Sequence, residues 1–125
     1  MNRLIAGIVF ALLVSLTGCR SALDFSEEDA MNHPWLFPFI DGYEIIEGKH
    51  YLSQGFIKLF IEVETVSEFW LYSDRIAENE NWNPGYKSEI TRVYVKDISI
   101  DQNREDIVIL VFTYSKDTII EVQIY

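Results

Sequence analysis

The most regular alternation of apolar and polar residues in this chain lies between Phe56 and Glu64. A period of two residues is typical of a β-strand that is buried on one face only. The aliphatic positions of this strand share one face, and they are Ile57, Leu59, Ile61 and Val63. The sequence therefore predicts a strand here that packs one face on a core.

The period changes to a helical one after Thr65. Thr65 and Glu68 have the spacing of a capping box, in which the first side chain accepts a hydrogen bond from the third helical amide. The following apolar residues recur three and four positions apart, and they are Val66, Phe69, Trp70, Ile76 and Ala77. This spacing predicts one helix from about residue 66 to 78, with a strand over residues 68–72 as the competing interpretation.

The region after the helix returns to β character through a polar loop over residues 79–87, where Asn83-Pro84-Gly85-Tyr86 fits a type II turn. Strands are expected at residues 90–95 and, after a bulge near Lys96-Asp97, through Ile98 and Ile100. A charged turn over 101–106 then precedes a strand over 107–114, which is apolar enough to be covered on both faces. A tight turn at residues 115–117 leads into a C-terminal strand over 118–125.

The region before the first clear strand is less regular. Two prolines within residues 33–39 argue against a helix, while three aromatic rings in the same stretch argue for burial of an extended segment. Asp41-Gly42 indicates a turn, followed by short strands over 43–46 and 50–52. The expected fold is thus α+β, an antiparallel sheet of about five to six strands with one helix packed on a face, in the order ββ(β)αβββ.

The N-terminus has a different pattern, because an apolar run from Leu4 to Leu16 follows Arg3. Thirteen residues are too few for a helix that needs about 20 to cross a bilayer. The run ends in Leu16-Thr17-Gly18-Cys19, which resembles the lipobox of bacterial lipoproteins at all four positions. The resemblance implies that residues 1–18 are a signal peptide that is removed, and that the Cys19 thiol carries a lipid anchor.

The residues behind the anchor complete the expected organisation. Residues 19–32 are polar and acidic, so we expect a lipidated cysteine followed by a flexible tether, with a short helix over 26–31 as an alternative. Residues 33–125 form the expected globular domain. The residue after the cysteine is Arg20 and not the Asp that commonly retains such proteins in the inner membrane, so the resemblance implies the periplasmic face of the outer membrane in a Gram-negative cell.

The net charge of the chain argues against some classes of binding partner. The chain has 10 basic and 20 acidic residues, a net charge of −10, and removal of residues 1–18 with Arg3 leaves 9 − 20 = −11. Such a domain is repelled by nucleic acid phosphates, so we expect no nucleic acid partner. The only cysteine is Cys19, so the domain contains no disulfide.

Few residues suggest chemistry. His33 and His50 are 17 positions apart in different predicted elements, and Asp101-x-Asn103-x-Glu105 lacks the glycine and the final glutamate of a calcium loop. No motif for a nucleophile with its base or for a phosphate-binding loop is present. We therefore expect no cofactor, no metal site, no identified small-molecule substrate and no enzymatic activity.

Two functions remain as expectations. The first is a lipid-anchored envelope protein that binds a protein partner, such as an inhibitor or immunity-type protein for a cationic enzyme or toxin. Its acidic surface would steer the partner, and Trp82 and Tyr86 would anchor it. The alternative is a structural or assembly accessory of the outer membrane, which would pair the edge of its C-terminal strand with another β protein.

Overall fold

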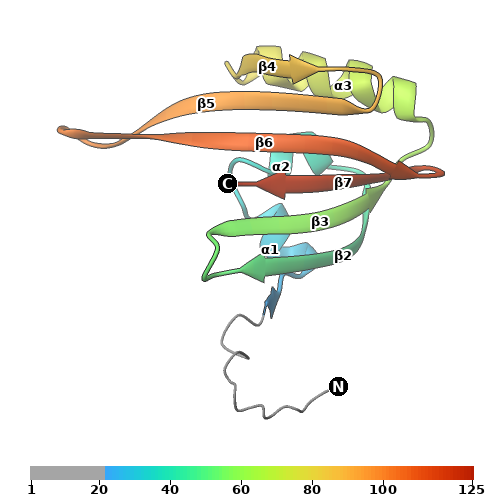
Figure 1. Cartoon of the computed structure of the whole chain (residues 1–125), viewed down its shortest axis with the longest axis horizontal. Coiled ribbons are helices and arrows are strands. Elements are labelled where there is room, and N and C mark those ends of the chain that lie inside the picture. Colours follow the sequence, from blue (N-terminus) through green and yellow to red (C-terminus); the bar gives the residue numbers. More distant parts are fainter. Residues whose placement is uncertain (1–21) are drawn as a thin grey trace, which may run out of the picture.

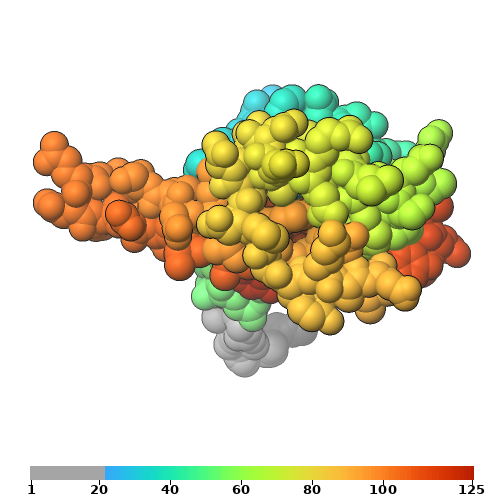
Figure 2. Space-filling model, turned by 90° about the horizontal axis from the view of Figure 1, so that it is seen from above, coloured from blue at the N-terminus to red at the C-terminus, as the bar shows by residue number. Residues whose placement is uncertain are grey.

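The chain forms a seven-stranded antiparallel sheet in the order β1-β2-β3-β7-β6-β5-β4, and the helices lie on one face of it (Figures 1 and 2). The computed structural model describes residues 22–125. In chain order the elements are β1 (Leu23–Asp24), α1 (Glu27–Met31), α2 (Phe37–Ile40), β2 (Glu44–Tyr51), β3 (Phe56–Glu62), α3 (Val66–Asn79), β4 (Asn83–Lys87), β5 (Thr91–Asp101), β6 (Arg104–Lys116) and β7 (Ile119–Ile124).

The core lies between the helices and the face of the sheet that they cover. Alternate residues of β3, β6 and β7 point into it, and Leu59, Leu110, Phe112, Ile120 and Val122 are fully buried there. The Phe112 ring lies 5.4 Å from both the Phe39 ring of α2 and the Phe69 ring of α3. The α+β class and the antiparallel sheet are therefore confirmed.

Helix α3 matches the helix predicted over residues 66–78. The Thr65 hydroxyl accepts a hydrogen bond from the amide of Glu68 at 3.3 Å, which is the N-cap half of the predicted capping box; among the described residues the Glu68 side chain makes no return bond to the Thr65 amide. Asn81 ends the helix in the left-handed region, with φ of 64°, and asparagine tolerates this conformation better than most residues. Phe69, Trp70, Ser73 and Ala77 form the buried side of the helix.

Strand β4 was not predicted, and it replaces the expected loop. Gly85 lacks the positive φ that a type II turn needs, and residues 83–87 pair with β5 instead, with an irregular register between Pro84 and Lys87. Proline is tolerated because β4 is an edge strand, where one side of the backbone needs no ladder partner. Together with β1 this raises the strand number above the five to six expected.

The extended segment predicted for residues 33–39 from their two prolines is wrong, because part of it is helical. Pro38 lies in the first turn of α2, where a missing amide hydrogen costs nothing, so a short helix forms at Phe37–Ile40. The expected burial is confirmed only in part, since Leu36 and Phe39 are fully buried, while Trp35 is half-buried and Phe37 is 39% exposed. Gly42, with φ of 91°, makes the expected turn, after which β2 is one strand with a bulge between Ile45 and Glu47.

The tether expected over residues 19–32 is folded from Leu23 onward. Leu23 and Asp24 pair with His50 and Lys49 of β2, and the Phe25 amide donates to the Gly48 carbonyl at 3.0 Å. A Cβ on residue 48 would lie 2.4 Å from the Phe25 carbonyl oxygen, so only glycine permits this approach. Helix α1 follows with a Ser26–Asp29 capping box, which confirms the alternative of a short helix.

The predictions for the last strands need three corrections. Strand β6 is covered on one face only, because Ile107 and Ile109 are exposed on the open face of the sheet. The register shift of β5 lies between Ser99 and Asp101 and not near Lys96. The charged turn expected over 101–106 is confined to residues 102–103, because β5 ends at Asp101 and β6 begins at Arg104. The β5–β6 hairpin projects from the body, as the orange segment in Figure 2 shows.

Strand β7 occupies an interior position. It pairs with β3 along one edge and with β6 along the other. The edge pairing that the accessory function required of the C-terminal strand is therefore contradicted. None of the helices in residues 22–125 has the length and apolar character needed to cross a membrane.

Candidate functional site

The two aromatic residues predicted to bind a partner line the same cavity, of about 310 Å³, between α3, β4 and β5. Tyr86 is 64% exposed at its rim. Trp82 is only 6% exposed, and its ring lies edge-on to those of Trp35 and Phe39. A surface anchor must be exposed, so Trp82 serves as a wall of this cavity and Tyr86 alone can meet a partner directly.

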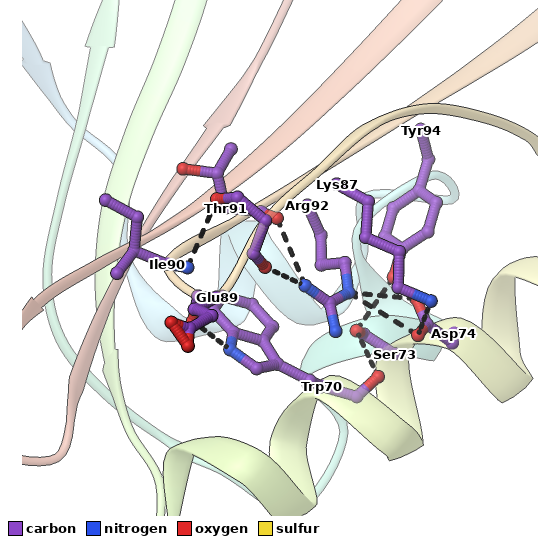
Figure 3. Close-up of polar contacts among 10 residues, drawn as sticks. Trp70, Ser73, Asp74, Lys87, Glu89, Ile90, Thr91, Arg92 and Tyr94 are labelled. Atoms are coloured by element: carbon purple, nitrogen blue, oxygen red, sulfur yellow. Dashed lines mark hydrogen bonds and ion pairs between the residues drawn. The ribbon is translucent and has the colours of Figure 1, made fainter.

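Polar side chains converge on Asp74 beside this cavity (Figure 3). The Tyr94 hydroxyl donates to Asp74 Oδ1 at 2.5 Å and lies 2.8 Å from Ser73 Oγ. Arg92 Nε lies 3.3 Å from Asp74 Oδ1, and Lys87 Nζ lies 3.4 Å from Oδ2. Helix α3 supplies the acid and the serine, while β4 and β5 supply the cations and the tyrosine.

Arg92 extends the cluster to the turn between β4 and β5. Its side chain is 10% exposed, and its guanidinium carbon lies 4.9 Å from the centroid of the Trp70 ring. Its Nη1 atom donates to the carbonyls of Ser88 and Thr91, and the Trp70 indole donates to the carbonyl of Glu89 at 3.0 Å. These contacts join the turn to α3.

The pKa shifts in this cluster show which charges are compensated. Burial by itself raises the pKa of Asp74, but the hydrogen bond from Tyr94 and the charges of Arg92 and Lys87 bring that pKa below its ordinary value. Burial, together with the bond to Asp74, raises the pKa of Tyr94 far above its usual range. The acid stays ionised and the phenol stays protonated, so each polar group has its partner.

A second cavity, of about 670 Å³, lies at the other end of α3. It is bounded by the start of β2, the end of β3, the first turn of α3 and the β6–β7 turn. Within the described part of the chain, its rim holds five carboxylates and no basic residue, and we call it the acidic cavity. The carboxylates belong to Asp41, Glu44, Glu62, Glu64 and Glu68.

Aromatic rings form part of the wall of the acidic cavity. Tyr43 is half-buried and its ring lies 5.3 Å from the fully buried ring of Phe69, in an edge-to-face arrangement. Burial raises the pKa of the Tyr43 phenol, and the charges of Glu68 and then Glu64 raise it further. The two glutamates thus add to the effect of burial at this ring.

The carboxylates of the acidic cavity have few partners. The Thr118 hydroxyl donates to Glu62 Oε2 at 3.2 Å, but none of the ion pairs formed within residues 22–125 includes a carboxylate of this rim. Glu44 lies directly opposite Glu62 in the β2–β3 ladder, where like charges repel. Unpaired carboxylates beside an aromatic ring suit a lysine or arginine side chain, which ring faces and acids both attract.

Sequence reasoning missed the acidic cavity. The segment from Glu62 to Glu68 has three glutamates in seven residues where a strand passes into a helix, and this clustering was a usable signal. Asp41 and Glu44 could not be assigned to the same site, because only the β2–β3 register brings them beside Glu62.

The remaining candidate residues do not form a further site. His33 and His50 approach the Phe25 ring at 6.3 and 6.2 Å, yet no group of three or more metal-ligating side chains occurs in the described part of the chain. Asp101 closes the β5–β6 turn by accepting from the Asn103 amide at 2.9 Å. Cys19 and the lipobox lie outside the described residues, so their role stays a prediction.

Comparisons of the chain with protein-family models, curated proteins and solved structures find no match.

Proposed function

We propose that this chain is a lipid-anchored protein of the bacterial envelope that binds a cationic protein, as an inhibitor or immunity-type protein does. The observation that carries the proposal is the acidic cavity, where five carboxylates surround a recess to which residues 22–125 contribute no basic side chain. Of the two cavities this one supports the function better, because the charges beside Tyr86 already neutralise one another.

The physical basis of recognition is complementary charge. After removal of residues 1–18 the net charge of 9 − 20 = −11 accelerates the approach of a cationic protein, and the acidic cavity provides a place where it can bind. A lysine or arginine of the partner would pair with Glu64 or Glu68 and pack its stem on Tyr43. Pairing would also relieve the repulsion between Glu44 and Glu62.

A salt-dependent binding measurement tests this proposal. The probe is a purified basic muramidase, titrated by calorimetry at about 50, 150 and 500 mM salt. We expect affinity to fall as salt rises, and the double variant Glu44→Gln with Glu64→Gln to weaken binding about tenfold.

A matched control separates the site from net charge. Asp97→Asn with Glu105→Gln removes the same charge from the exposed β5–β6 hairpin and is expected to weaken binding far less. Equal losses in both double variants, or no binding to any basic envelope enzyme, would contradict the proposed site. Tyr86→Ala tests the predicted aromatic anchor, and it is preferable to Trp82→Ala, which would damage the core.

The lipid anchor needs a test of its own. Mass spectrometry of the protein purified from membranes should find acyl groups on Cys19 and cleavage before it. Cys19→Ala should release the domain into the soluble fraction with its fold intact. If the variant stays in the membrane unprocessed, the result shows only an uncleaved signal, so the deciding outcome is a wild-type protein without lipid, which would overturn the anchor.

A further inference from the structure

The first strand begins close to the proposed point of lipid attachment. Only residues 20–22 separate Cys19 from Leu23, which pairs with His50 of β2. Four residue steps span at most about 14 Å. A domain of this size has a radius of gyration of about 13 Å, so its diameter exceeds the length of this connection. A lipid on Cys19 would therefore hold one end of the domain against the bilayer.

That end of the molecule carries exposed apolar side chains. Strand β1 lies beside β2 at this end of the sheet (Figure 1). Leu23 of β1 is 54% exposed, and Leu52, in the turn between β2 and β3, is 57% exposed. The rings of Tyr51, Phe56 and Tyr125 stack in a row next to this turn, with centroid separations of 4.8 and 5.4 Å. We call these five residues the β2–β3 patch.

The charges around the β2–β3 patch differ from those of the rest of the chain. Residues 49–58 include Lys49 and Lys58, which lie opposite each other on neighbouring strands, and no carboxylate. Asp24, the nearest acid on β1, is paired with Lys49 at 2.6 Å. Lysine side chains at a membrane surface extend their ammonium groups to lipid phosphates, and tyrosines favour the same interfacial depth.

We propose that the β2–β3 patch is the surface on which the domain rests on the bilayer that holds its anchor. The inference depends on the proposed lipid at Cys19. The two leucines and the row of rings enter the interfacial region, while Lys49 and Lys58 meet phosphate groups. Contact of this kind is weak alone, but the short connection keeps the patch at a high effective concentration near the lipid.

This orientation places the acidic cavity away from the membrane. Glu44 and Tyr51 are the two ends of β2, and Glu62 and Phe56 are the two ends of β3. Seven residue steps along a strand correspond to about 23 Å, well beyond the Debye length of about 8 Å. The acidic cavity thus faces the aqueous side, where a cationic protein can reach it and where lipid charge no longer repels it.

Hydrogen exchange on the anchored protein tests this orientation. The sheet and core lie within residues 23–124, so a chain that begins at Cys19 contains the whole described fold. Its cysteine is coupled to a maleimide lipid in vesicles of phosphatidylcholine and phosphatidylethanolamine, and a soluble form capped at the same thiol is the reference. Amides of residues 49–58 should exchange about tenfold more slowly on vesicles, while those of the projecting hairpin at 97–106 keep their rate.

Matched variants complete the experiment. Leu23→Ser with Leu52→Ser should abolish most of the protection, since each leucine contributes about tenfold when buried. Ile100→Ser alters a similarly exposed residue of the hairpin, 47% exposed, and should change nothing. Equal exchange of residues 49–58 in the anchored and soluble forms would overturn the orientation. Protection that appears without vesicles as protein concentration rises would also overturn it, because a second copy would then cover the patch.

Because the lipid is attached chemically, the outcome does not depend on whether cells lipidate Cys19. A failure of the orientation is therefore distinguishable from a failure of the proposed function, which the mass of the natural protein and the muramidase titration decide.

Discussion

The two cavities beside α3 differ in whether their carboxylates are paired with cations. In the cavity of Trp82 and Tyr86, Asp74 is bonded to Tyr94 and paired with Arg92 and Lys87. In the acidic cavity, five carboxylates share a rim without any cation. The paired charges hold three elements together, whereas the unpaired ones repel each other and stay available to a partner. Under the proposed function, the unpaired charges are therefore the ones that a cationic partner would use.

The largest loss of stability is expected from a change beside the cavity of Trp82 and Tyr86. Asp74→Asn keeps the size of the side chain but leaves the Arg92 guanidinium, 10% exposed, without its carboxylate. We expect unfolding in urea at pH 7 to show a loss of about 2 to 3 kcal/mol, because a poorly solvated charge loses its partner.

The corresponding change in the acidic cavity, Glu64→Gln, removes an exposed carboxylate without an ion-pair partner among the described residues. We expect its unfolding free energy to stay within about 0.5 kcal/mol of the wild-type value. Similar losses in both variants would mean that the two cavities do not differ in the way that their contacts indicate.

Acid should remove the stabilisation that Asp74 provides. The folded protein lowers the pKa of Asp74 below its ordinary value of 3.8, so the unfolded chain binds this proton more readily than the folded one. The contribution is therefore complete above about pH 4 and is lost as pH falls through the folded pKa. Urea titrations from pH 7 to pH 3 should show the gap between wild type and Asp74→Asn closing in the acid range. A gap as large at pH 3 as at pH 7 would exclude the charge as its cause.

The two tyrosines allow the same substitution to be compared in both cavities. Tyr94→Phe removes a hydroxyl that donates to Asp74 and contacts Ser73, so we expect a loss of about 1 to 2 kcal/mol. Tyr43→Phe removes a hydroxyl without a hydrogen-bond partner among the described residues, and we expect a change below about 0.5 kcal/mol. Thermal unfolding of the two variants measures both values, and a larger loss for Tyr43→Phe would reverse the comparison.

Much of the fold was predictable because its signals are local. The capping spacing of Thr65 and Glu68 identified α3, and alternation identified β3. The errors arose where a tertiary contact decided the outcome. Residues 23–31 are polar enough to suggest a tether, yet the absence of a side chain at Gly48 lets the chain dock on β2. Pro84 suggested a turn, although an edge strand accepts it.

The sites were less predictable than the fold. Trp82 and Tyr86 were identified from their residue types, but burial separates them, and no local pattern distinguishes a tryptophan in a wall from one on a surface. The Asp74 cluster joins α3 to residues 13 to 20 positions away, and its members carry no motif. The acidic cavity depends on the β2–β3 register, which the sequence could not provide.

The smallest predicted effect has the opposite sign. Glu44→Gln removes one of two carboxylates that face each other across β2 and β3, so it should stabilise the fold by about 0.2 to 0.5 kcal/mol in low salt. About 1 M salt, with a Debye length near 3 Å, should remove most of this gain. Glu105→Gln, which lies opposite Ser99, is the control and should have almost no effect. A gain in both variants would assign the effect to net charge. A gain in unfolding free energy confined to Glu44→Gln, together with weaker binding of the basic muramidase, would show that Glu44 destabilises the fold while it strengthens partner binding.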